Sequence, residues 1–199
     1  MAIMLSEGSG LVGLARASVE AYVLGEELPG AGGAPLLSEE RGVFVTINLA
    51  GNSVDKLRGC IGYPYPVLKL GEAVRSAAIA AASEDPRFPP LVRGDLLEVV
   101  FEVSVLTSPT EVGKDSRTEL PSRVRLGVDG LIVSSGQGSG LLLPQVATEH
   151  GMDGQEFLSQ ACLKAGLQPD AWKEPSTRVL VFQAEAFAET EPRGEVARV

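Results

Sequence analysis

The chain contains few of the side chains from which metal sites and disulfide frameworks are built. Its 199 residues include one histidine, His150, and two cysteines, Cys60 and Cys162, which form no CxxC or Cys/His spacing. The sequence therefore predicts no metal site and indicates no particular cofactor. A disulfide between the two distant cysteines is not expected either, because the cytoplasm keeps thiols reduced.

Long apolar runs and clusters of basic residues are also missing. No stretch reaches the roughly 18 apolar residues of a membrane span, and residues 1–10 lack the basic start and apolar run of a secretory signal. A cytoplasmic protein is therefore expected. The net charge of -9 disfavours non-specific nucleic-acid binding, because phosphate contacts need clustered Lys and Arg. The scarcity of Asn and the excess of Arg over Lys are compatible with a heat-adapted source.

The apolar patterns predict an α+β fold, with a largely antiparallel sheet flanked by helices. Hairpins alternate irregularly with helices along the chain, which disfavours a doubly wound parallel sheet. The Asp153 and Glu156 pair has capping-box spacing and predicts the start of one helix. Period-3.6 patterns predict helices at 11–23, 70–82 and 154–165. Alternating patterns predict strands at 43–50, 57–61, 99–106 and 178–187 and a short meander at 124–128, 131–135 and 141–144.

The stretch "LRGCIGYPYP", residues 57–66, is the first candidate site. Read as a strand, it turns its apolar residues to the core and presents Arg58 and Cys60 on the opposite face. Gly59 and Gly62 leave room for a backbone or a ligand to approach. A guanidinium near a thiol favours the nucleophilic thiolate. The alternative is that Cys60 is a small buried residue of an ordinary hairpin.

The proline-stiffened stretch "EDPRFPP" is the second candidate. Glu84, Asp85, Arg87 and Phe88 lie in a segment that can hold charged groups in fixed positions at low entropic cost. The alternative is a helix-ending turn in which one of the two acids pairs with Arg87 at the surface.

The stretch "LLLPQVATEH" is the third candidate. The amide of Gln145 can read a peptide or base edge, and His150 could accept a proton from Cys60 if the fold brings them together. The nearby "GQGSG", residues 136–140, lacks phosphate-loop spacing and is interpreted as a hairpin turn. Cys162 has helical spacing and is expected in the core.

Several of these stretches together resemble the AMMECR family. The resemblance runs from about Arg41 to Phe187, and residues 57–62 match the family's six-residue signature. It implies one AMMECR-type domain over residues 1–188, made of two lobes with a RAGNYA-like fold and with the signature near the cleft between them. Residues 189–199 are expected to form a polar, disordered tail. His150 departs from the family, whose members often carry an aromatic residue there. The stretches that carry the resemblance are "LRGCIGYPYP", "SEDPRFPPL", "FEVSVLTSP", "GVDGLIV", "GLLLPQVATEHGMDGQEFLSQACLKAGLQPDAW" and "VLVFQAEAF".

The family has no settled activity, so two hypotheses stay open. The first is an enzyme for a small anionic or nucleotide-like substrate, with Cys60 as nucleophile or general acid and Arg58 holding the anion. In it, Glu84 or Asp85 carries a proton. The second is a non-catalytic adaptor for a peptide, protein or nucleotide, with Cys60 structural. The resemblance also implies Memo-type and radical-SAM proteins as partners. The residues expected to contact a substrate are Gly59, Gly62, Asp85, Arg87, Phe88 and Gln145.

Overall fold

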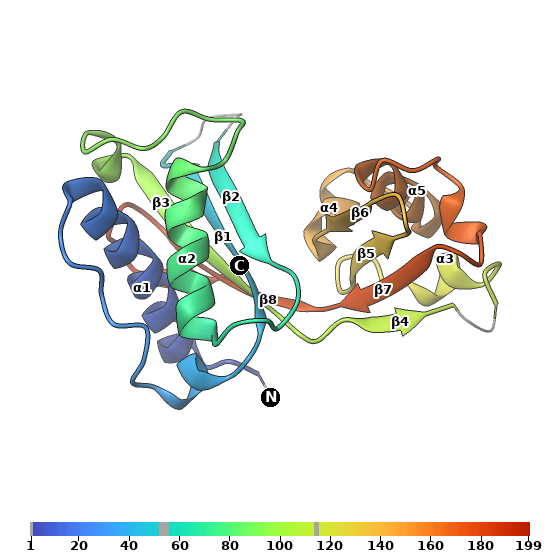
Figure 1. The fold of residues 1–199 in the computed structure, drawn as a ribbon, viewed down its shortest axis with the longest axis horizontal. Helices are drawn as coiled ribbons and strands as arrows, with labels where there is room; N and C mark the ends of the chain where they lie inside the picture. The colour runs from blue at the N-terminus through green and yellow to red at the C-terminus, as the bar shows by residue number, and fades with distance from the viewer. Residues whose placement is uncertain (1, 52–55, 114–115) are drawn as a thin grey trace. The chain divides into compact units, whose positions relative to one another are not determined.

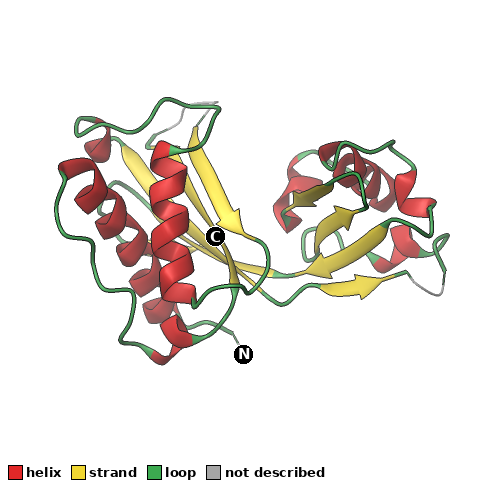
Figure 2. Ribbon diagram, in the orientation of Figure 1, coloured by secondary structure: helices red, strands yellow, loops and turns green. Residues whose placement is uncertain are grey.

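The structure is a computed structural model that describes residues 2–51, 56–113 and 116–199 (Figure 1). The chain divides into two compact units. Unit 1 comprises Met1–Leu106 and Glu185–Val199, and unit 2 comprises Thr107–Ala184. Each unit combines an antiparallel sheet with helices, as Figure 2 shows, which confirms the α+β prediction. Within the described residues, no helix is long and apolar enough to cross a membrane.

The sheet of unit 1 has five strands in the order β2-β1-β3-β8-β9. The central strand β1 pairs antiparallel with both β2 and β3, which confirms the predicted hairpin strands. Residues 52–55 of the predicted hairpin turn lie outside the described residues. The strands are β1 (Gly42–Leu49), β2 (Leu57–Tyr63), β3 (Val99–Leu106), β8 (Ala184–Glu189) and β9 (Val196–Arg198).

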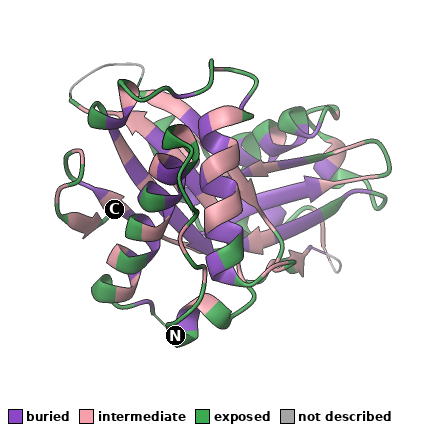
Figure 3. Cartoon of the chain, turned by 60° about the vertical axis from the view of Figure 1, so that its left-hand side comes forward, coloured by how far each residue is buried: buried purple, intermediate pink, exposed green. Residues whose placement is uncertain are grey.

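Two helices cover one face of this sheet. Helix α1 (Leu5–Leu24) packs against β3 and α2, and α2 (Leu70–Ser83) packs against β1 and β2 (Figure 1). Figure 3 shows the buried side of α2 facing the sheet, where small alanines let the helix approach closely. Two short 3-10 helices, η1 (Pro35–Ser38) and η2 (Asp95–Leu97), complete the unit.

Unit 2 has a four-stranded sheet in the order β4-β7-β5-β6. Helix α5 packs on β5 and β6, and the predicted capping box is present: Glu156 N donates to Asp153 and Asp153 N donates to Glu156. Cys162 is fully buried, as predicted. The turn predicted at 136–140 is present between β5 and β6 but is shorter, because residues 139–140 already belong to β6. The elements are β4 (Thr110–Val112), α3 (Leu120–Arg123), β5 (Gly130–Ser134), β6 (Ser139–Leu142), α4 (Pro144–Glu149), α5 (Gly154–Lys164), η3 (Ala171–Lys173) and β7 (Arg178–Phe182).

Two predicted strands were wrong. Residues 124–128 form a turn, because Gly127 has a positive φ of 75° and Asp129 accepts hydrogen bonds from Arg125 across the turn. The strand predicted at 178–187 is two strands in different sheets, β7 in unit 2 and β8 in unit 1. Gln183 lies between them and exchanges two hydrogen bonds with Thr107.

The predicted disorder at the C-terminus is wrong as well. Residues 196–198 form β9, which pairs antiparallel with β8 from Phe187 to Glu189. Arg198 adds an ion pair with Glu185 and a hydrogen bond to the carbonyl of Ile3. Main-chain pairing and these contacts hold the polar C-terminal segment in an ordered strand.

Candidate functional site

The candidate site in unit 1 is built on β2, which is an edge strand of its sheet. An edge strand leaves main-chain N–H groups unpaired, and proteins commonly cover them. Here the N–H of Cys60 donates to Oδ2 of Asp85 at 2.9 Å, and Asp85 comes just after Glu84, the C-cap of α2. The loop after α2 therefore covers part of the edge of β2.

Asp85 holds Arg87 in place. Its carboxylate is nearly sealed from solvent and accepts from the Arg87 main-chain N and from Nε and Nη2, the last at 2.7 Å. The hydrogen bonds from the Arg87 guanidinium hold the pKa of Asp85 well below its usual range, and the main-chain donors Cys60 and Arg87 act in the same direction against burial. The pair raises the pKa of Arg87 in turn. Both groups are charged at neutral pH.

Arg58 has other partners than the thiol. Its Nη1 donates to the carbonyl oxygen of Pro89 at 2.8 Å, and its Nη2 lies 3.5 Å from Oδ2 of Asp95. Arg58 therefore fastens the proline-rich segment to β2. The cation whose charge acts on Cys60 is Arg87.

Cys60 lies on the face of the sheet opposite α2. It stands across from Thr46 of β1, whose hydroxyl donates to the Cys60 sulfur at 3.3 Å. Burial raises the pKa of the Cys60 thiol, and Glu102 and Asp85 add to that effect, while Thr46 and Arg87 oppose it. At neutral pH the group is therefore a thiol and not a thiolate.

The two glycines of the stretch are explained by packing within unit 1. A Cβ at Gly59 would run into the carbonyl oxygen of Ala81 in α2. A Cβ at Gly62 would run into the ring of Phe44 on β1. The room that the sequence predicts for a ligand is occupied at both positions by parts of the protein.

The other residues that the sequence singles out lie at the end of α2, beside Arg87 and in unit 2. Glu84 is exposed at the end of α2, and no contact joins its side chain to Cys60 within the described residues. Phe88 lies next to the guanidinium of Arg87, with 5.3 Å from Cζ to the ring centroid. Gln145 and His150 lie on and just after α4, in unit 2. The described contacts thus join Cys60, Asp85 and Arg87.

Comparison with known proteins decides the family. The family model described as AMMECR1 matches residues 12–187. The chain belongs to the AMMECR1 family. The resemblance that the sequence shows is thereby confirmed, and the matched range includes the whole cluster around Cys60.

The similar proteins include archaeal ones, some of them from thermophiles. A protein of Thermofilum pendens is 54% identical over 96% of this chain and 93% of its own. The Methanocaldococcus jannaschii protein MJ0810 is 42% identical over 98% of this chain and 96% of its own. The crystal structure of the uncharacterized protein PH0010 from Pyrococcus horikoshii is similar with a TM-score of 0.94 and 44% identity, over 99% of this chain and 98% of that chain.

Thr46 is the member of the site that sequence reasoning missed. The signal that could have found it is the hairpin register, because the residue across from Cys60 on the same face must be a neighbour of the thiol. Thr46 stands in the alternating stretch 43–50 on the face with Phe44 and Asn48. Strand pattern alone does not set that register.

An Asp85→Asn substitution should make the free energy of unfolding change less as the pH falls into the acid range. The lowered pKa of Asp85 means that its stabilisation is present above the ordinary Asp pKa, near 3.8, and is lost as pH falls through the folded-state pKa. We expect the variant to lose about 2–4 kcal/mol of unfolding free energy at pH 7. Urea unfolding at pH 7 and at about pH 2.5 measures the difference, which should shrink in acid. A gap that stays constant between the two pH values would contradict the assigned role.

Proposed function

We propose that unit 1 binds a small anionic group at Arg87, with the Cys60 thiol beside it. The observation that carries the proposal is that the Arg87 guanidinium is fixed in position but still has free donors. Asp85 fixes its Nε and Nη2, yet 53% of its side chain is exposed, and its Nη1 makes no hydrogen bond to the described residues. A guanidinium that is held in place with donors left over suits a carboxylate or phosphate.

Cys60 supplies a neutral donor in this proposal. Thr46 already donates to the sulfur, so the S–H proton of Cys60 is available to a bound ligand. Because its pKa is raised, the thiol can serve a reaction as a general acid, whereas attack as a nucleophile would need the thiolate. Of the two catalytic roles considered for Cys60, we therefore propose general acid, acting on an anionic or nucleotide-like substrate.

The second candidate function is a non-catalytic adaptor in which Cys60 is structural. It is favoured by apolar side chains just after β2: Tyr65 is 40% exposed and Val67 is 64% exposed. A peptide or protein partner would cover such side chains. The Memo-type and radical-SAM partners implied by the family remain a prediction.

A titration with pyrophosphate tests the anion site. We expect saturable shifts of the Cys60 and Arg87 main-chain amide signals in NMR spectra, with a dissociation constant at or below about 1 mM. An Arg87→Gln variant should weaken binding by about tenfold or more, since it removes the fixed cation. Arg93→Gln is the matched control, because Arg93 is exposed in the same loop and lies outside the cluster.

Two results would contradict the proposal. One is the absence of saturable shifts at these residues up to about 10 mM pyrophosphate. The other is an equal loss of affinity in the Arg87→Gln and Arg93→Gln variants, which would show that general charge and not the fixed guanidinium holds the probe.

A further inference from the structure

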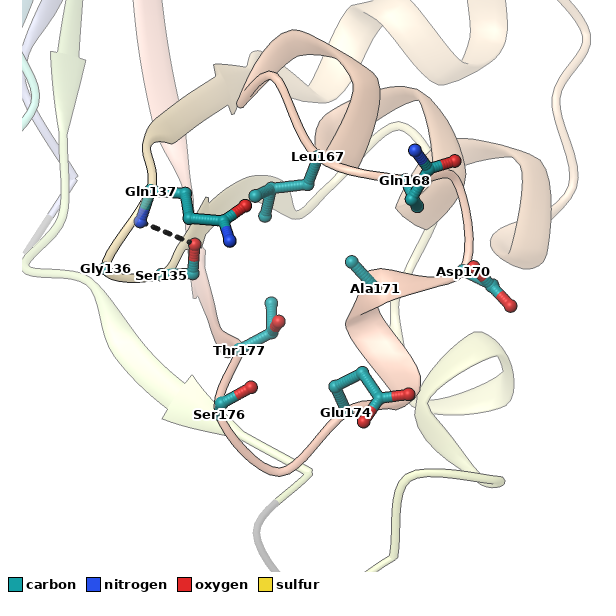
Figure 4. A pocket seen from close by; sticks show the side chains of 10 residues that line it. All are labelled: Ser135, Gly136, Gln137, Leu167, Gln168, Asp170, Ala171, Glu174, Ser176 and Thr177. Atoms are coloured by element: carbon teal, nitrogen blue, oxygen red, sulfur yellow. Dashed lines mark hydrogen bonds between the residues drawn. The ribbon is translucent and has the colours of Figure 1, made fainter.

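Unit 2 contains a hollow that the proposed anion site does not use. Its volume is about 450 Å³, within the range of small-molecule sites. Figure 4 shows that three segments enclose it: the turn between β5 and β6, the segment after α5 that includes η3, and the segment before β7. The residues that line it are Ser135, Gly136, Gln137, Leu167, Gln168, Asp170, Ala171, Glu174, Ser176 and Thr177.

The charged side chains that line the hollow are all negative. Asp170 and Glu174 bring two carboxylates, the other polar side chains are neutral hydroxyls and amides, and no Lys or Arg is among these lining residues. Leu167 and Ala171 add apolar surface. Such a hollow disfavours anions, and it offers hydrogen-bond acceptors and negative charge to a ligand with N–H donors.

Thr177 shows that the hollow has unused hydrogen-bonding capacity. The residue is only 3% exposed, and its carbonyl accepts from Nη2 of Arg117 at 2.8 Å. Its hydroxyl makes no hydrogen bond to the described residues, and Figure 4 shows the side chain directed into the hollow, on the same side as Gln137 and Ser176. A hydroxyl that faces the hollow without a protein partner is expected to bond to water or to a ligand.

We propose that this hollow binds a small organic cation, a ligand with ammonium or guanidinium groups on a short apolar stem. Glu174 and Asp170 attract the charged ends, the hydroxyl of Thr177 and the amide oxygen of Gln137 accept N–H groups, and Leu167 contacts the stem. The ligand class is opposite in charge to that of the Arg87 site. The binding of each ligand class can therefore be tested independently of the other.

The protein carries its own reporter for occupancy. Trp172 is the single tryptophan of the chain and lies in η3 between Ala171, which lines the hollow, and Lys173. It is buried, with the Lys173 Nζ 5.2 Å from its ring centroid. Tryptophan emission responds to changes in nearby charge and packing, so ligand binding next to η3 should alter the fluorescence of Trp172.

The experiment is a fluorescence titration of the full chain with three four-carbon probes. Putrescine carries two ammonium groups, 1,4-butanediol carries two hydroxyls and succinate carries two carboxylates. We expect a saturable change with putrescine and an affinity at least about tenfold lower for the other two. Similar responses to all three probes, or no saturable response to putrescine, would overturn the proposal.

Variants locate the binding. Glu174→Gln should weaken putrescine binding by about fivefold or more, because it removes one carboxylate of the lining. Glu149→Gln is the matched control: it removes the same charge from an exposed position at the end of α4 that does not line the hollow. Equal weakening in both variants, or none in Glu174→Gln, would show that the cation does not bind in this hollow.

Discussion

Replacing Glu189 with glutamine is expected to lower the free energy of unfolding by about 3–5 kcal/mol. Glu189 is buried and accepts from Nε and Nη2 of Arg16 at 2.5 Å each, and from the Phe101 N–H at 3.0 Å. Arg16 is buried too: desolvation lowers its pKa, but the hydrogen bonds and charges of Glu189 and Glu20 together raise the pKa above its ordinary value. A neutral amide would leave the buried guanidinium with only its ion pair to the partly exposed Glu20, at 3.2 Å. Urea unfolding at neutral pH measures the loss.

An exposed ion pair provides the control for this prediction. Glu119 and Arg123 pair on α3 with about half of each side chain exposed, 57% and 44%. Glu119→Gln should change the stability by less than about 0.5 kcal/mol, since solvent screens such pairs. If the two substitutions cost similar amounts, the Arg16 and Glu189 pair would not be the buried connection that the structure shows.

The second large effect is expected for Gly59→Ala, which should cost about 3 kcal/mol or more. Gly59 is buried on the α2 side of β2, and the new methyl group would collide with the carbonyl oxygen of Ala81. That oxygen belongs to the backbone and cannot rotate away, so either α2 or β2 must shift. Thermal unfolding should show a strongly lowered Tm.

Gly13→Ala is the matched control for Gly59. Gly13 lies inside α1, is exposed, and has nothing within 4 Å of the position of a Cβ. Alanine there should stabilise the protein by about 0.5–1 kcal/mol through helix propensity. A Gly59→Ala variant as stable as the natural protein would mean that close packing does not explain the glycine in the signature.

Much of the fold could be predicted because its elements have strong local patterns. The alternation in β1 and β3 and the alanine-rich face of α2 identify these elements without tertiary information. Local pattern is not sufficient for the segment 178–187. Its alternation is continuous, and only the pairing of its two halves in different sheets divides the segment into β7 and β8. Likewise, nothing local connects Arg16 with Glu189, which are 173 positions apart.

The candidate site could be predicted only in part, for related reasons. The sequence identifies Cys60, Asp85 and Arg87 as candidates, but it assigns the anion to Arg58 and leaves the proton carrier open between Glu84 and Asp85. Which of the adjacent acids turns inward depends on the residue at which α2 ends, and helix ends are poorly specified by sequence. The partners of Arg58 depend on how the proline-rich segment folds back along β2.

Cys60 is a protonated thiol that lies beside a fixed Arg87. The most direct test is the rate of Cys60 alkylation by iodoacetamide as a function of pH, read by mass spectrometry with buried Cys162 as the internal reference. We predict a midpoint above the ordinary cysteine pKa of about 8.5, and a further rise in the Arg87→Gln variant, because the guanidinium favours the thiolate. A midpoint near or below neutral pH would instead identify Cys60 as an activated nucleophile and contradict its assignment as a protonated thiol.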